Sequence, residues 1–107
     1  MTKRMQIRVA LAAVLAMAGT SGFAQSTGEA LYKAKCQMCH GATGMADTGA
    51  AKAMKVKPIN DPSVKDLSEA KMIEAVREGM GKMQPYKGKL TDAQIKDAVT
   101  HFRTFLK

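Results

Sequence analysis

The sequence predicts a small all-α fold with three main helices joined by long loops. Three separate stretches repeat their apolar residues at helical spacing, and each begins with a residue that can cap a helix. No stretch shows the alternating β-branched pattern that is typical of a strand. The length of 107 residues leaves room for one domain only.

The first predicted helix covers about residues 27–36 and the second about residues 68–79. Ser26 and Glu29 fit a capping box at the start of the first helix, and Ser68 can cap the second. The first helix takes its apolar side from Ala30, Leu31 and Ala34. The second takes its apolar side from Ile73, Val76 and Met80.

The third predicted helix, at about residues 91–106, has the clearest pattern. Thr91 and Gln94 form a second capping box at its start. A continuous apolar stripe follows, made of Ile95, Ala98, Val99, Phe102 and Leu106. We therefore expect this helix to bury one face against the rest of the domain.

Two loops separate the three helices. Residues 41–67 are rich in Gly and Pro, with a short helical turn predicted at about residues 50–55, and residues 81–90 are rich in Gly and Lys. A connection as long as the first one is unusual in so small a domain unless something organises it. A bulky apolar cofactor inside the loops would provide that organisation.

Residues 1–24 have the layout of a cleaved secretory signal peptide. Three basic residues precede an apolar run at residues 9–18, and small residues occupy Gly22 and Ala24. The alternative is a membrane anchor, but a span needs about 20 apolar residues and this run has half that number. A lipid anchor is disfavoured because no cysteine lies at the cleavage site. We expect cleavage after Ala24, export to the periplasm, and one domain at residues 25–107.

Cleavage at this site would leave 83 residues with a moderately basic charge. It removes three of the 17 basic residues and none of the nine acids, so the net charge becomes +5. Such a surface favours partners with an acidic face. The lysines are spread along the chain with few aromatics between them, which argues against nucleic-acid binding. A domain this short also commonly needs a cofactor, a metal ion or a disulfide to stabilise its small core.

Residues 36–40, Cys-Gln-Met-Cys-His, match the attachment signature of a c-type haem. Two thiols one helical turn apart can each add to one of the neighbouring vinyl groups of a porphyrin. The histidine that follows is then placed as an axial ligand of the iron. Cys36, Cys39 and His40 are therefore the candidate residues for one covalently bound haem.

Two other interpretations of the cysteine pair are weaker. A redox dithiol usually follows a strand, and none is predicted here. A structural zinc site needs four ligands, and His101 is the only other His or Cys in the chain.

The residue that binds the iron on the side opposite His40 determines the class of function. A bound side chain there favours electron transfer, whereas an open position allows chemistry at the iron. Met83 is our first choice for this iron ligand. It lies in an irregular loop after Gly79 and Gly81 and before Pro85, where the backbone can approach a flat cofactor. Met80 is the second choice. Met72 and Met80 follow the helical pattern, where methionine is more often core filler. His101 lies in the last predicted helix, where a surface or a helix-packing role suits it. The full set of candidates is Met45, Met54, Met72, Met80, Met83 and His101.

These motifs resemble the class I cytochromes c, in particular the small single-haem bacterial forms related to cytochrome c6 and the oxidase-associated c domains. The matching segments are residues 28–32, 36–44, 81–91 and the terminal helix. The resemblance implies an all-α cytochrome c fold wrapped around one haem, with Met83 as the distal iron ligand. It also implies that the first and last helices cross, with Gly28 and Tyr32 meeting an aromatic near the chain end.

Two positions depart from the usual pattern of that family. Gln84 stands between the candidate ligand Met83 and Pro85, whereas many relatives have the proline directly after the methionine. The last helix has His101-Phe102-Arg103 where many relatives have Tyr-x-Arg, so Phe102 is the expected aromatic substitute.

With His40 and Met83 on the iron, no coordination position stays open. The expected function is that of a soluble, monomeric periplasmic carrier of single electrons, not an enzyme. Thioether ligation favours the ferrous state. The lysines near the two loops are either a docking face for redox partners or ordinary solvated side chains: Lys52, Lys55, Lys57, Lys82, Lys87 and Lys89. The alternatives are a haem sensor or small peroxidase with a displaceable distal ligand, a subunit of a larger respiratory complex, and a thiol protein without haem.

Overall fold

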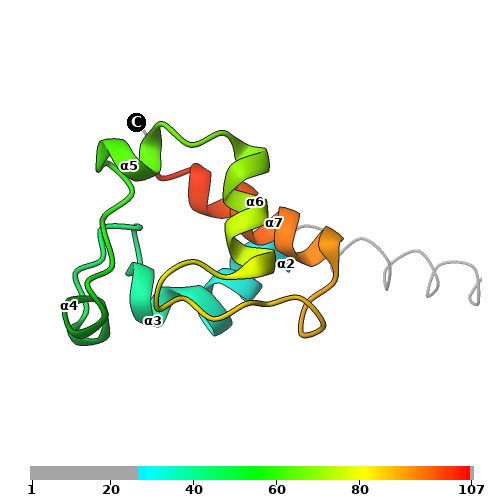
Figure 1. Ribbon diagram of the computed structural model, residues 1–107, viewed down its shortest axis with the longest axis horizontal. Coiled ribbons are helices and arrows are strands. Elements are labelled where there is room, and N and C mark those ends of the chain that lie inside the picture. Colours follow the sequence, from blue (N-terminus) through cyan, green and yellow to red (C-terminus); the bar gives the residue numbers. More distant parts are fainter. Residues whose placement is uncertain (1–26, 107) are drawn as a thin grey trace, which may run out of the picture.

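The computed structural model describes residues 27–106 and shows an all-helical domain in that part of the chain (Figure 1). The predicted all-α class is confirmed. The signal peptide predicted at residues 1–24 and the cap at Ser26 lie outside the described residues. The elements are α2 (Thr27–Leu31), η1 (Tyr32–Cys36), α3 (Gln37–His40), α4 (Gly49–Met54), α5 (Pro62–Lys65), α6 (Glu69–Glu78) and α7 (Asp92–Arg103).

The first helix is longer than the sequence predicts. It continues through α2, η1 and α3 to His40, and its middle part is a π-helix in which the Gln37 N–H donates to the Tyr32 carbonyl. Gly41 ends it with a positive φ of 85°. The attachment motif is therefore the last turn of a helix and not the loop that follows one.

The capping predictions for α6 and α7 are confirmed. Ser68 accepts a hydrogen bond from the backbone N–H of Lys71. Thr91 and Gln94 form the complete capping box, with distances of 3.1 and 2.9 Å. A capping interaction involves residues within a four-residue segment, so it can be predicted from the local sequence without knowledge of the tertiary fold.

The two shorter helices lie in the long loop. The turn predicted at residues 50–55 is α4, capped by the Thr48 hydroxyl, which accepts from the Ala51 N–H at 3.0 Å. Helix α5 is not predicted by periodicity. Its signal is Asp61 at the cap followed by Pro62 at the first helical position, a favourable pair at a helix start.

The core forms where α6 packs against α7. Met72 from α6 and Ile95 and Val99 from α7 are at most 5% exposed. Partly buried apolar side chains surround them, namely Val64, Leu67, Ile73, Val76, Tyr86, Leu90 and Phe102. Met72 is therefore core filler, as predicted.

Helices α2 and α7 cross at Gly28. A Cβ atom on Gly28 would lie 2.5 Å from the carbonyl oxygen of Asp97, so only glycine allows this approach. Tyr32 stacks on Phe102 with ring centroids 5.9 Å apart. The predicted crossing and the aromatic role of Phe102 are confirmed, but Gly28 meets the backbone of α7 and not an aromatic ring.

No helix among residues 27–106 combines the length and the apolar character that a bilayer span requires.

Candidate functional site

The two cysteines lie on the same helical segment, with Cys36 at the end of η1 and Cys39 in α3. Both are free thiols and both are partly buried. Burial, with a smaller effect from nearby Cys39, raises the pKa of the Cys36 thiol to about 11. Cys36 therefore stays a protonated thiol at neutral pH.

His40 completes the motif at the end of α3. Its ring contacts Phe102 edge-on, with centroids 5.1 Å apart. Burial lowers the pKa of His40, so the imidazole is neutral at neutral pH, which is the form that binds metals. Its buried Nδ1 has no hydrogen-bond partner among the described residues. A buried polar atom without a partner calls for an explanation, and a bound metal or cofactor is one.

Tyr32 holds the backbone just after this histidine. Its hydroxyl donates to the carbonyl of Gly41 at 2.5 Å, and its side chain is 1% exposed. Burial raises the pKa of Tyr32, so the hydroxyl stays a donor. His101 packs against Tyr32 and Phe105, each at a centroid distance of 5.3 Å, in agreement with the helix-packing role expected for it.

The methionines differ sharply in their surroundings. Met83 is partly buried, whereas Met80 is 62% exposed. The interpretation of Met80 as core filler is wrong, because α6 ends at Glu78 and Met80 lies in the loop beyond it. Met45 and Met54 are each 41% exposed, and Met38 in the attachment turn is 76% exposed.

The loop after α6 turns sharply at Gly79, which has a φ of 81°. A Cβ on Gly79 would lie 2.8 Å from the Met83 carbonyl oxygen and 3.0 Å from the Pro85 nitrogen. The loop therefore folds back on the end of α6. The N–H groups of Tyr86 and Lys87 then donate to the carbonyls of Val76 and Arg77, at 3.0 and 3.1 Å.

Tyr86 also joins this loop to the attachment helix. Its hydroxyl donates to the carbonyl of Lys35 at 3.1 Å, although the two residues are 51 positions apart. Figure 1 shows the loop after α6, in yellow, crossing the α3 region. The structure thus brings the segment that carries Met83 beside the segment that carries Cys36, Cys39 and His40. Sequence reasoning missed this role of Tyr86, because no local pattern signals a contact of such long range.

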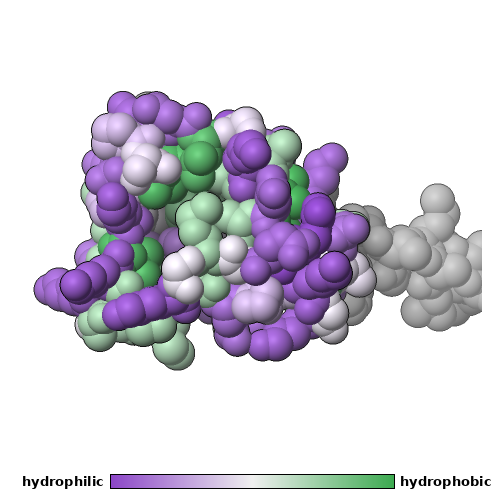
Figure 2. Space-filling model, viewed as in Figure 1, coloured by the Kyte–Doolittle hydropathy of each residue, from purple (hydrophilic) through white to green (hydrophobic). Residues whose placement is uncertain are grey.

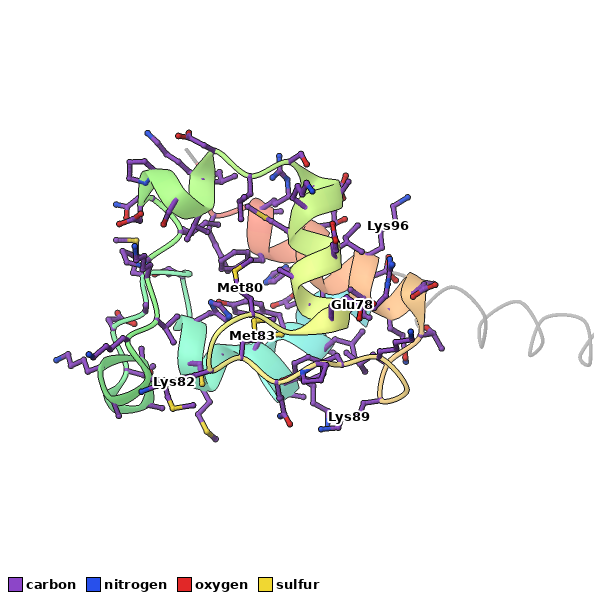
Figure 3. All side chains as sticks on the ribbon, in the orientation of Figure 1. Glu78, Met80, Lys82, Met83, Lys89 and Lys96 are labelled. Carbon is purple, nitrogen blue, oxygen red and sulfur yellow. The ribbon has the colours of Figure 1, made fainter. Side chains whose placement is uncertain are left out.

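The face that carries this loop is apolar toward its middle. Figure 2 shows hydrophobic residues gathered between α4 and α5 and toward the loop, with hydrophilic residues around them. In Figure 3, Met80 and Met83 lie in the middle of the same view, and Lys82 and Lys89 lie nearer its edge.

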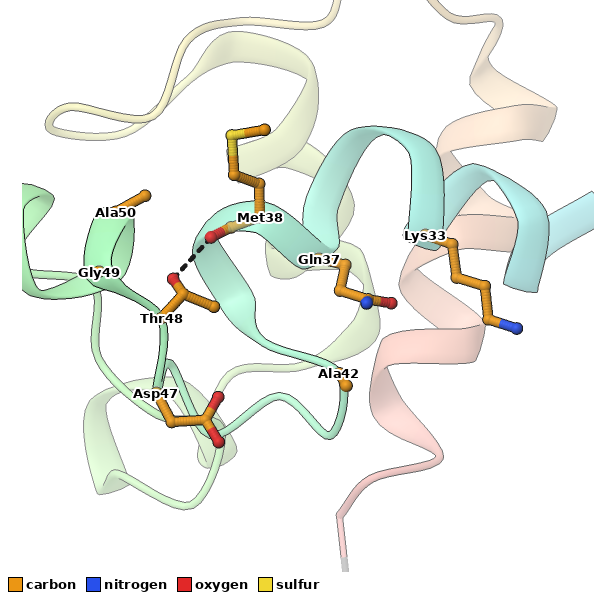
Figure 4. Close-up of a pocket in the computed structure, with 8 residues that line it drawn as sticks. All are labelled: Lys33, Gln37, Met38, Ala42, Asp47, Thr48, Gly49 and Ala50. Carbon is orange, nitrogen blue, oxygen red and sulfur yellow. Dashed lines mark hydrogen bonds between the residues drawn. The ribbon is translucent and has the colours of Figure 1, made fainter.

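A separate hollow of about 640 Å³ lies beside α3 and α4 (Figure 4). It is open and of mixed polarity, and a 2.6 Å hydrogen bond from the Thr48 hydroxyl to the Met38 carbonyl links two of its lining residues. Its lining residues are Lys33, Gln37, Met38, Ala42, Asp47, Thr48, Gly49 and Ala50. None of the candidate haem residues is among them, so this hollow is distinct from the candidate site.

A comparison with protein families decides the class of the chain. The family described as "Cytochrome C oxidase, cbb3-type, subunit III" matches residues 23–102. The chain belongs to this cytochrome c family. A solved structure, "KustC0563 c-type cytochrome", is similar to this cytochrome with 32% sequence identity and a TM-score of 0.67, over 75% of this chain and 98% of the other. The comparison with curated proteins gave no match.

The cytochrome is therefore an electron-transfer haem protein, as its family and its structural relative both indicate. The c-type class implies that its haem is bound covalently. Among residues 27–106, no three His, Cys, Asp or Glu side chains form a group that could hold a metal ion. The zinc interpretation of the cysteine pair thus finds no further ligands in the described part of the chain.

Proposed function

We propose that this cytochrome is a soluble periplasmic carrier of single electrons with one haem c, held by Cys36 and Cys39 and ligated by His40 and Met83. The observation that carries the proposal is the Tyr86–Lys35 hydrogen bond, because it places the methionine loop beside the attachment helix. The bound haem supplies a one-electron iron couple.

The side chains present fit such a group. Cys36 and Cys39 are free and one helical turn apart, so both thiols are available for thioether bonds. The neutral ring of His40 is positioned by Phe102 and not by a hydrogen bond at Nδ1. Met83 has a thioether on a loop that two backbone hydrogen bonds and the Tyr86 hydroxyl hold in place. Two protein ligands would leave no open position on the iron, which supports electron transfer over catalysis.

The cysteines have the clearest test. In Cys36→Ala or Cys39→Ala, we expect one thioether bond to be lost and the other to persist, and the double variant should retain no covalent haem. Haem staining of denatured protein on a gel, with the absorption spectrum in alkaline pyridine, measures this directly. Gln37→Ala, in the same turn, is the matched control and should keep both bonds. Covalent haem in the double variant would show that the attachment site lies elsewhere.

We also propose that exposed lysines around the loops form the docking face for acidic redox partners. The set is Lys52, Lys55, Lys57, Lys82, Lys87 and Lys89, all of them exposed. Within residues 27–106, none of the six is in an ion pair. Their positive charge is thus free to attract an acidic surface and raise the rate of encounter.

Small charged redox reagents test this docking face. We expect the rate of electron exchange with the anion hexacyanoferrate to fall about tenfold as the salt concentration rises. A factor of about ten is the lower end of the rate enhancement that electrostatic steering gives. The cation hexaammineruthenium should show the opposite trend. Lys82→Gln should slow the exchange with hexacyanoferrate at low salt. Lys96→Gln on α7, far from Lys82 in Figure 3, is the control and should leave the rate unchanged. A rate that does not depend on ionic strength argues against the docking face.

The family match favours one alternative, a subunit bound permanently in a respiratory oxidase. Fractionation of the native host separates the two possibilities. A free carrier appears as a monomer in the periplasmic fraction, whereas a permanent subunit stays with the membrane complex.

A further inference from the structure

Met80 and Met83 face each other across a two-residue hairpin. The Met83 N–H donates to the Met80 carbonyl at 2.9 Å, and the Met80 N–H donates to the Met83 carbonyl at 3.1 Å. Between them, Gly81 has a φ of 57° and Lys82 has a negative φ. Glycine at the first central position with a positive φ is the pattern of a type II′ turn, which makes a tight and well-defined hairpin.

This pairing fixes the directions of the two side chains. Residues that exchange both backbone hydrogen bonds lie directly opposite each other, with Cα atoms about 5.5 Å apart. Their side chains leave the hairpin on the same face. The thioethers of Met80 and Met83 therefore emerge side by side, and each has three rotatable bonds with which to reach a shared point. Figure 3 shows both residues in the middle of the same view.

The exposure of Met80 is not explained by packing. Its side chain is 62% exposed, and it lies outside both α6 and the core around Met72. Met83 is more buried, and its carbonyl lies against Gly79. The hairpin thus presents one partly buried methionine and one exposed methionine on a single face.

We propose that Met80 is a second thioether ligand for the iron, which the hairpin can present in place of Met83. This inference rests on the proposed function, because it requires a haem held by Cys36, Cys39 and His40. Met83, the more buried of the two, is the ligand in the resting protein. Met80 replaces it by side-chain rotation when the Met83 thioether is absent, because each methionine has three rotatable bonds. The hairpin itself keeps its backbone hydrogen bonds throughout.

The test uses the holoprotein in four forms: unchanged, Met80→Leu, Met83→Leu and the double variant. Leucine keeps the volume and removes the sulfur, so the fold is little affected. Two spectroscopic readouts report the ligand: the far-red band from methionine to ferric iron, and carbon monoxide binding to the ferrous protein. Met38→Leu, in the attachment turn and 76% exposed, is the control for loss of an exposed methionine.

We expect both single variants to retain the far-red band and to exclude carbon monoxide, and the double variant to lose the band and bind carbon monoxide. If Met83→Leu loses the band and Met80→Leu keeps it, Met83 is the sole ligand. The inference is then overturned and the proposed function stands. If Met80→Leu alone loses the band, Met80 is the sole ligand, and both the inference and the assignment of Met83 are wrong. A band that persists in the double variant assigns the ligand to another methionine and overturns both. An unchanged protein without the band overturns the proposed ligation itself, before any variant is considered.

Discussion

Replacing Gly28 with valine should lower the free energy of unfolding by about 3 kcal/mol or more, the upper end of the usual cost of overpacking. A Cβ at this position would lie 2.5 Å from the carbonyl oxygen of Asp97 and 3.0 Å from its carbonyl carbon. Both are backbone atoms of α7, so relief requires the whole helix to move. Movement of α7 would also displace Ile95 and Val99 from the core. A domain of this size has about 5–15 kcal/mol of stability in total, so the loss is severe.

Denaturant unfolding of the holoprotein, followed by circular dichroism, measures this cost. Gly28→Ala should show a smaller loss in the same direction. Gly49→Ala is the matched control, because Gly49 begins α4 and a Cβ there would meet no atom within 4 Å. We expect the control to be neutral or slightly stabilising, since alanine is the better helix former. Equal stability of the Gly28 and Gly49 variants would mean that the helix crossing is looser than the structure shows.

Gly79→Ala should disturb the methionine loop and weaken the far-red band of the ferric protein. The alanine would have to adopt a φ of 81°, which strains an L-residue by about 1–3 kcal/mol. Its Cβ would also meet the Met83 carbonyl oxygen at 2.8 Å. The variant therefore combines backbone strain with a clash against the residue proposed to ligate the iron.

Gly88→Ala separates the two effects. Gly88 has almost the same φ, 83°, but a Cβ there meets no atom within 4 Å. We expect both variants to lose stability through strain, and only Gly79→Ala to lose intensity in the far-red band. If the two variants change the band alike, the contact between Gly79 and Met83 does not position the ligand.

Local signals predicted where the second and third helices begin. The predicted end of the third helix near Leu106 is wrong, because α7 ends at Arg103. Ser68 and Thr91 cap α6 and α7 as expected, because a capping bond spans only three residues. Helix α5 was missed, although Asp61-Pro62 is a start signal that does not depend on periodicity. The extension of the first helix to His40 has no such signal. The Tyr32 hydroxyl, one part of the same helix, donates to the Gly41 carbonyl, and Phe102 from the distant α7 contacts the His40 ring.

The candidate site also combines features that the local sequence predicts with features that depend on tertiary folding. The spacing of Cys36, Cys39 and His40 identifies the attachment turn without any structure, because the motif is contiguous. The position of Met80 was misjudged because Ile73, Val76 and Met80 continue a helical spacing. Gly79 with its positive φ ends the helix first, and glycine after a helical run is a known stop signal. The link from Tyr86 to Lys35 depends on tertiary folding and could not be predicted from the sequence.

The π-helical turn at Tyr32–Cys36 has a consequence for how sequences of this kind can vary in length. A turn closed by a bond from residue i+5 to residue i contains one residue more than an α-turn. The helical segments before and after it therefore keep their directions while the chain between them holds an extra residue. A relative with one residue fewer between the crossing glycine and the first cysteine would form an uninterrupted α-helix with the same crossing and the same attachment turn. Alignments of such chains should allow a single-residue gap at this turn, inside what is otherwise continuous helix.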